Sequence, residues 1–180
     1  MQKPHLKSII SHTKIRQAVQ KLASEIRKDY SDKNPVLIGI LKGSFVFLSD
    51  IARELNIPLK IDFIRAASYG SKDYSGGAVE MIKDIEMYVE GKDVLIVEDI
   101  VDTGLTIHFV INHLKEKMPA SIKICSLLDK PSKRKVDVRV DYKGFTLDKD
   151  IGFVVGYGLD FNEEYRYLKD IYELKPAFSL

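Results

Sequence analysis

The chain has 180 residues, 45% hydrophobic and 30% charged, a composition typical of a globular protein with a full core. Its 28 Lys and Arg residues nearly balance 26 Asp and Glu residues, and the net charge of +2 does not favour bulk binding of nucleic acid. The single cysteine, Cys125, excludes a disulfide within the chain. With no secretory leader or bilayer-length apolar run recognised, we expect a cytoplasmic protein without membrane or nucleic-acid partners.

Helical and strand patterns alternate from the start of the chain. Thr13 is expected to cap a first helix, because apolar residues recur after it at helical spacing. The apolar run 36–41 predicts a buried strand, and residues 42–44 are expected to open a second helix.

A long hairpin is predicted next. Strands are expected over residues 59–67 and 78–84. The segment 68–77 between them is polar and rich in Gly and Ser, which is typical of a mobile loop.

The most informative stretch is residues 94–106. Residues 94–97 are all apolar, as in a strand buried on both faces, and Glu98 and Asp99 follow where that strand is expected to end. A polar loop with a glycine, 102–106, precedes a helix. Such a loop and helix N-terminus favour an anion, which two carboxylates would repel unless a divalent cation or a cationic reaction centre lies between. The stretch therefore predicts chemistry on a phosphorylated, metal-bound substrate.

The second half of the chain completes an α/β pattern. Strands are predicted over 122–128 and 153–158, with a half-exposed strand over 136–140. Strands alternating with helices predict one α/β domain whose mostly parallel sheet is flanked by helices, with functional loops at the carboxyl ends of the strands. The groups expected to converge there are Lys42 and Gly43, Glu98 and Asp99, Asp129 and Lys130, and Asp160.

Several segments together resemble a known family. Residues 98–106, EDIVDTGLT, resemble the signature with which type I phosphoribosyltransferases bind phosphoribosyl pyrophosphate (PRPP). Further segments resemble the bacterial hypoxanthine phosphoribosyltransferases in the same order, and the resemblance covers about residues 6–176. It implies the type I fold, with a small hood and a flexible loop over the active site. It also implies a single domain over 1–180, whose hood is formed by the N-terminal and C-terminal segments. The further segments are 41–44, 68–70, 127–131 and 153–160.

The resemblance implies a purine salvage enzyme. It would transfer the 5-phosphoribosyl group from PRPP to hypoxanthine, and to guanine, giving IMP or GMP and pyrophosphate with Mg²⁺. Asp102 would be the general base, and the Leu41–Lys42 peptide can be cis in this family. PRPP and its 5′-phosphate would be held by Glu98, Asp99, Asp102, Thr103, Gly104, Leu105 and Thr106. Pyrophosphate would be contacted by Lys42 through its backbone, Gly43 and Arg166.

The same resemblance implies how the purine is selected. The Lys130 ammonium would donate to the O6 acceptor of a 6-oxopurine, and the amino group of adenine would leave it unpaired at a penalty of roughly 1–3 kcal/mol. Phe153 would stack on the base, Val154 would read its edge through the backbone, and Asp160 would complete the purine site. Residues 144–153 form a longer segment than the family pattern and lack its proline. Ser68 and Tyr69 would belong to the closing loop, and Mg²⁺ would be held by Glu98, Asp99 and Asp160.

Other interpretations remain open. Taken singly, each feature has an ordinary structural explanation, such as solvated carboxylates at a strand end, and only their joint occurrence in order favours the enzyme. The alternatives are an enzyme that accepts xanthine, or a PRPP-sensing, RNA-binding regulator on the same fold. The regulator needs a basic face, which the balanced charge does not favour. The enzyme is expected to be a homodimer or homotetramer.

Overall fold

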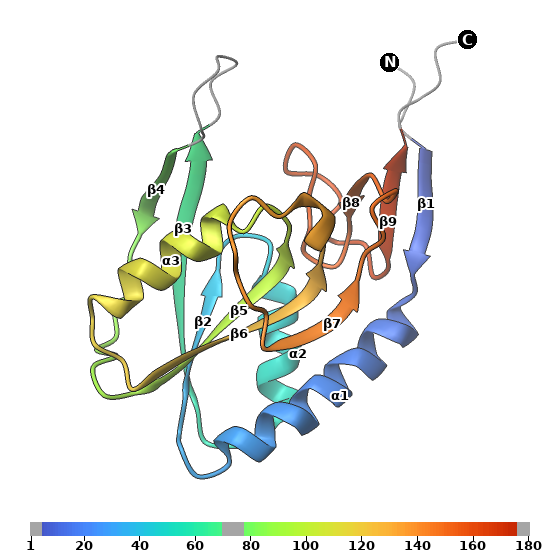
Figure 1. Ribbon diagram of the computed structural model, residues 1–180. Helices are drawn as coiled ribbons and strands as arrows, with labels where there is room; N and C mark the ends of the chain where they lie inside the picture. Colours follow the sequence, from blue (N-terminus) through green and yellow to red (C-terminus); the bar gives the residue numbers. More distant parts are fainter. Residues whose placement is uncertain (1–4, 70–77, 176–180) are drawn as a thin grey trace.

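The computed structural model describes residues 5–69 and 78–175 (Figure 1). Residues 70–77 of the predicted hairpin loop lie outside this part of the chain. Within it, no helix is both long and apolar enough to cross a bilayer. The elements in chain order are β1 (His5–Ile10), α1 (His12–Tyr30), β2 (Val36–Ile40), α2 (Phe45–Leu55), β3 (Lys60–Tyr69), β4 (Ala78–Lys83), β5 (Asp93–Val101), α3 (Leu105–Lys115), β6 (Ser121–Asp129), the 3-10 helix η1 (Pro131–Lys133), β7 (Tyr142–Thr146), β8 (Phe153–Val155) and β9 (Ile171–Lys175).

The main sheet has six strands in the order β4-β3-β2-β5-β6-β7. All pairs are parallel except β3 with β4, which form the predicted hairpin. Val36 of β2 lies opposite both Lys60 and Val94, so β2 is paired on both sides. Its five residues are all buried, as expected of an uninterrupted apolar run. The predicted mostly parallel sheet is confirmed.

Helices cover both faces of this sheet (Figure 1). Leu95 and Val97 of β5 belong to the hydrophobic cluster that contains the buried faces of α1 and α2. Val94 and Ile96 belong to a second cluster with the buried face of α3. Because side chains alternate along a strand, one apolar strand supplies both layers of the core.

A second, smaller sheet with the order β1-β9-β8 forms the hood. His5 lies opposite Lys175, so the two ends of the described chain run antiparallel side by side. Ile10, Val154 and Ile171 of these strands belong to the same hydrophobic cluster as α1 and α2, which joins the hood to the main sheet. Figure 1 shows the hood and the β3–β4 hairpin on either side of the edge where β5 and β6 end.

The expected cap at Thr13 is wrong. Helix α1 begins at His12, after Ser11, and Ser11 makes no side-chain hydrogen bond to the helix. The His12 N–H instead donates to Asp170 Oδ1 at 2.8 Å. A carboxylate 158 residues away in the chain therefore supplies the acceptor that a local side chain was expected to provide.

Three strand predictions also differ from the structure, and one of them is the strand predicted over 153–158, which ends at Val155. Strand β5 does not end at Glu98 but continues to Val101, because β6 keeps pairing with it beyond that point. Residues 136–140 form no strand, although their burial alternates as predicted. Val138 and Val140 pack against the cluster under α3, and the pairing with β6 begins only at Tyr142.

Candidate active site

The predicted phosphate loop lies between β5 and α3. Gly104 is the N-cap of α3 and has a φ of 81°, a left-handed conformation that favours glycine. A Cβ at this position would lie 3.1 Å from Arg134 Cδ and from Val136 Cγ2. The glycine therefore allows both the turn and the close packing of the next segment. The helix N-terminus that follows is suited to an anion.

A cavity of about 200 Å³ opens at this loop. Asp102 is exposed, and its carboxylate accepts a hydrogen bond from the Thr103 N–H. Leu105 N–H donates to Thr103 Oγ1 at 3.4 Å, while Leu105 itself is not part of the cavity lining. The lining residues are Glu98, Ile100, Val101, Asp102, Thr103, Gly104, Thr106 and Ile107.

Glu98 brings an uncompensated carboxylate to this cavity. Its Oε2 is buried and has no hydrogen-bond partner among the residues that the structure describes. Burial raises the pKa of Glu98 well above its usual value, and the charges of Asp99 and Asp102 raise it further. A carboxyl group in this position would be stabilised by a bound cation.

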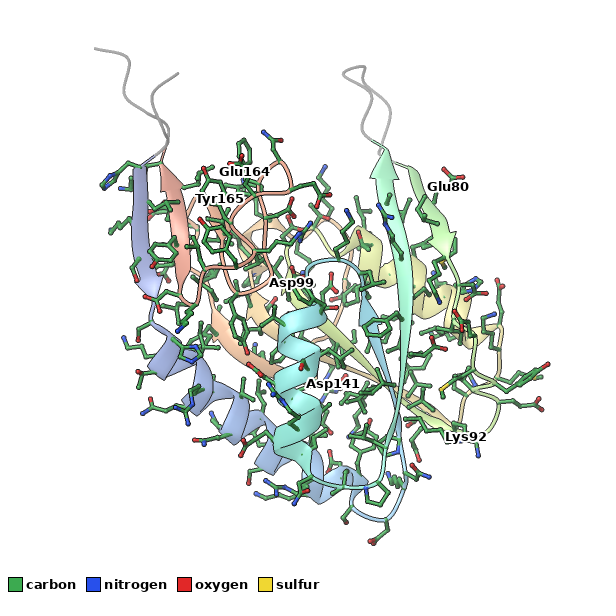
Figure 2. All side chains as sticks on the ribbon, turned by 180° about the vertical axis from the view of Figure 1, so that it is seen from behind. Glu80, Lys92, Asp99, Asp141, Glu164 and Tyr165 are labelled. Atoms are coloured by element: carbon green, nitrogen blue, oxygen red, sulfur yellow. The ribbon has the colours of Figure 1, made fainter. Side chains whose placement is uncertain are left out.

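Asp99 faces a different part of the site. A Cβ on Gly43 would lie 1.8 Å from Asp99 Oδ2, so only a glycine fits beside this carboxylate. Burial raises the pKa of Asp99 to about 6, although the hydrogen bond from Ile100 N–H and the charge of Arg166 act in the opposite direction. Figure 2 shows Asp99 at the N-terminal end of α2, towards the part of the molecule that carries Glu164 and Tyr165.

Charged side chains meet where the hood approaches this carboxylate. Arg166 donates to Asp160 Oδ1 at 2.8 Å, to Glu163 Oε2 at 3.1 Å and to the Gly158 carbonyl at 2.8 Å. Lys42 Nζ also contacts Glu163, at 2.8 Å. The hydrogen bonds from Lys42 and then from Arg166 lower the pKa of Glu163 below its usual value. The structure therefore brings Lys42 and Arg166 together on Glu163, and Arg166 also contacts Asp160.

Glu163 was missed by sequence reasoning, although it lies at the centre of this group. The available signal was its place between Asp160 and Arg166, three residues from each. The Leu41–Lys42 peptide on the opposite side is cis, as the resemblance implies. Asp160 follows β8 of the hood, so not all the converging groups come from main-sheet strands.

The predicted purine residues lie beside the end of β6. Lys130 is only 5% exposed, and its Nζ donates to the carbonyls of Ile151 and Gly152, the latter at 3.0 Å. Phe153 is 55% exposed and meets Phe161 edge-on, with ring centroids 5.5 Å apart. An exposed aromatic ring and a nearby buried ammonium are the groups needed to hold a planar base.

Val154 lies on an edge strand of the hood. Val154 pairs with Glu173 on β9, and β8 is the edge of the hood sheet. One row of its backbone polar groups therefore faces away from β9. Ser68 and Tyr69 end β3, and Gly70 to Gly77 lie outside the described residues.

Arg134 joins the purine region to the phosphate loop. Its guanidinium donates to the Asp102 carbonyl at 2.8 Å and to the carboxylate of Asp129. Lys135 N–H donates to the Thr103 carbonyl at 2.9 Å. Arg134 lies in a basic stretch that follows a strand, yet its side chain is only 16% exposed. No local pattern distinguishes it from its lysine neighbours.

The fold and the site together define a class of nucleotide-processing enzyme, in which a strand, a phosphate loop and a helix lie beside acidic groups. The Phosphoribosyl transferase domain matches residues 5–162 of this chain. The chain therefore belongs to the phosphoribosyltransferase family, as its sequence predicted.

Individual members of this family are similar to the chain over most of its length. The chain is 44% identical over 171 residues to the hypoxanthine-guanine phosphoribosyltransferase of Bacillus subtilis, covering 95% of this chain and 94% of that protein. A crystal structure of a hypoxanthine-guanine phosphoribosyltransferase from Bacillus anthracis matches with a TM-score of 0.87 and 42% identity, over 94% of this chain and 99% of that chain. A hypoxanthine-guanine-xanthine phosphoribosyltransferase structure matches with a TM-score of 0.84 and 37% identity, over 94% and 97%.

Proposed function

We propose that this protein transfers the 5-phosphoribosyl group from PRPP to hypoxanthine and guanine, giving IMP or GMP and pyrophosphate. Family membership supports the reaction class. The observation that carries the proposal is the cavity at the N-terminus of α3, which joins a phosphate cradle to the unpartnered carboxylate oxygen of Glu98. Anion and cation sites side by side suit a substrate that is both phosphorylated and metal-bound.

PRPP would span the two charged halves of the site. Its 5′-phosphate would bind the loop from Asp102 to Thr106, where backbone N–H groups and the helix dipole favour an anion. Its pyrophosphate would lie near Lys42, Gly43 and Arg166, whose charges meet at Glu163. Pyrophosphate oxygens would then compete with the Glu163 carboxylate for the same two cations.

The residues present fit a magnesium ion that arrives with the substrate. No three Asp, Glu, His or Cys side chains within 5–69 and 78–175 are close enough to hold a metal alone. Mg²⁺ in such sites uses one or two carboxylates together with substrate phosphates, which suits Asp99 with Asp160 on the pyrophosphate side and Glu98 beside the phosphate loop. When bound, Mg²⁺ would offset the charge of the leaving pyrophosphate.

The base would be bound between Lys130 and Phe153. Phe153 is an exposed aromatic residue that would stack on the base, and the buried ammonium of Lys130 can only donate. A donor at this position pairs with the 6-oxo group of hypoxanthine or guanine and not with the 6-amino group of adenine. The backbone of Val154 and Asp160 would complete the site, and Ser68 and Tyr69 at the end of β3 would belong to the closing segment.

Asp102 would act as the general base. Its carboxylate is exposed at the mouth of the cavity, with its orientation fixed by the Thr103 N–H. From there it could take the proton from one imidazole nitrogen of the purine while the other attacks C1 of the ribose. Loss of this proton keeps the attacking nitrogen nucleophilic as the pyrophosphate leaves.

We further propose that residues 1–180 form a single domain, that the protein acts in the cytoplasm, and that it assembles as a homodimer or homotetramer. The shared hydrophobic cluster of hood and main sheet supports the first point. The other two follow from the family resemblance and are tested by fractionation and by analytical ultracentrifugation.

The decisive experiment measures product formation from PRPP and Mg²⁺ with hypoxanthine, guanine, xanthine or adenine in turn. We expect turnover with hypoxanthine and guanine, at least ~10-fold less with adenine, and no turnover after EDTA. Xanthine tests how the site treats the purine 2-position, since one structural relative is named for its use. No turnover with any of the four bases would refute the proposal.

A further inference from the structure

The buried charge of Lys130 has an unusual environment. The side chain is only 5% exposed, and within the described residues its ammonium makes no ion pair. Its hydrogen bonds go to two backbone carbonyls, those of Ile151 and Gly152. A buried ammonium is unfavourable unless its donors are satisfied and its charge is balanced.

A carboxylate lies on the other side of the same peptide group. Glu173 on β9 is 9% exposed, and its Oε1 accepts the Gly152 N–H at 2.9 Å. That N–H and the Ile151 carbonyl belong to one peptide unit, and the carbonyl accepts from Lys130 Nζ. The peptide dipole is therefore held between an anion at its N–H end and a cation at its C=O end, an arrangement in which each hydrogen bond strengthens the other.

The hood fixes this carboxylate in place. Glu173 lies opposite Val154 in the pairing of β8 with β9, so the strand register fixes its position along the strand, close to Gly152. A Cβ on Gly152 would lie 3.2 Å from Glu173 Oε1, which shows how closely the two residues approach. The nearest cation to Glu173 is Lys175, at 3.9 Å from Oε2 and partly exposed. The attraction between the Lys175 ammonium and the Glu173 carboxylate is weak compared with the hydrogen bond from the Gly152 N–H.

We propose that Glu173 is a positioning residue for base selection, acting on Lys130 through the Ile151–Gly152 peptide. The inference rests on the proposed function. A lysine ammonium has three N–H donors, and two are directed to the carbonyls of Ile151 and Gly152. The third is left for an acceptor on the substrate, and the fixed ammonium favours a 6-oxo over a 6-amino group. The segment 144–153 thereby becomes part of the specificity site.

Two substitutions at Glu173 separate the effect of its charge from that of its hydrogen bond to Gly152. Glu173→Gln keeps an oxygen acceptor for the Gly152 N–H and removes the charge, whereas Glu173→Val removes both. We expect KM for hypoxanthine to rise ~3- to 10-fold in the first variant and ~10-fold or more in the second, with a falling ratio of hypoxanthine to adenine use. KM for PRPP should change less than ~2-fold, because the contacts of the phosphate loop are elsewhere.

The controls distinguish positioning from a loss of structure. Glu90→Gln removes the same charge from an exposed turn at the far end of β5 and should leave both KM values unchanged. In a Lys130→Ala background, Glu173→Gln should have no further effect on the base ratio, since its action passes through Lys130. The amide proton of Gly152 should also shift upfield in the NMR spectrum of Glu173→Gln, as its charged acceptor is lost.

These experiments distinguish a failure of the Glu173 proposal from a failure of the proposed function. If the wild-type protein turns over none of the four bases, the proposed function fails. If it is active but both Glu173 variants keep the wild-type KM for hypoxanthine and the wild-type base ratio, the role of Glu173 is refuted. Equal rises in the KM values for hypoxanthine and PRPP, or an additive effect in the Lys130→Ala background, would also refute it.

Discussion

Glu98 and Asp99 are neighbours in the chain but serve different parts of the site. Glu98 lines the phosphate cavity, whereas Asp99 lies against Gly43 and is influenced by Arg166. Adjacent strand residues point to opposite sides, so one dipeptide can place charge on both. The repulsion between carboxylates and a bound phosphate therefore arises at two places, one at Glu98 and one at Asp99. A metal-bound substrate would reduce the repulsion at each.

Substitution of Asp102 tests its proposed role as the general base. Asp102→Asn should lower kcat by ~10²- to 10⁴-fold, because the amide can accept the Thr103 N–H but cannot take a proton from the purine. Steady-state kinetics would check this, with KM for PRPP expected to stay close to the wild-type value. Asp32→Asn, on an exposed residue after α1, serves as the control. A wild-type kcat in Asp102→Asn would remove Asp102 as the base.

The raised pKa of Asp99 should make the stability of the folded protein depend on pH. Its pKa in the folded protein is about 6, above the ordinary value of 3.8, so its protonated form favours folding. That contribution is fully present below pH 3.8 and is lost as the pH rises through 6. Asp99→Asn should therefore stabilise the substrate-free protein in EDTA increasingly from pH 4 to pH 7, by as much as about 3 kcal/mol. Urea unfolding across this range would measure the difference, and a pH-independent difference would contradict the argument.

At the scale of elements, the start of α1 depends on the far end of the chain. Asp170, just before β9, accepts the His12 N–H at 2.8 Å and also contacts Ser8 Oγ at 3.4 Å. It therefore acts as an N-cap for α1 and ties β1 to the segment before β9.

Asp170→Ala should destabilise the protein by about 1 kcal/mol, the usual effect of losing an N-cap acceptor. Chemical denaturation would measure the change. Asp170→Asn, which retains an oxygen acceptor, should lose less. Equal losses in the two variants would show that the charge matters and not the hydrogen bond.

For the whole molecule, the contact between the hood and the main sheet sets the geometry of the proposed pyrophosphate site. Gly158 has a φ of 99°, and a Cβ there would lie 2.3 Å from the Gly43 carbonyl. Its own carbonyl accepts from Arg166. The approach of these two glycines therefore sets the distance between the Lys42 side and the Arg166 side of the proposed pyrophosphate site.

Gly158→Ala should force the hood away from Gly43, raise KM for PRPP by ~10-fold or more, and destabilise the fold by about 1–3 kcal/mol. The control is Gly91→Ala, at a φ of 65° with nothing within 4 Å of the added Cβ. It shares the backbone strain without the collision and should leave KM for PRPP unchanged. Similar kinetics in the two variants would mean that the close approach is unimportant.

The sequence by itself determined the parts of this protein that depend on neighbours in the chain. The apolar runs of β2 and β5 predict buried parallel strands, because only strands covered on both faces are apolar throughout. The phosphate loop is equally local, since the strand, the glycine and the helix start are consecutive. The resemblance of residues 98–106 to a known signature follows from the same compact segment.

Tertiary structure decided the rest. Glu163, Arg134 and Glu173 have no distinctive local pattern, and each gains its role from a partner that the fold brings near: Lys42, the Asp102 carbonyl and Gly152, at separations of 121, 32 and 21 residues. Residues 136–140 alternate in burial as a strand would but pair with no strand in the described part of the chain, and Asp170, not Thr13, supplies the acceptor at the start of α1. Hydrogen bonds and charges act over a few ångströms in space whatever the distance along the chain, so periodicity and spacing cannot reveal them.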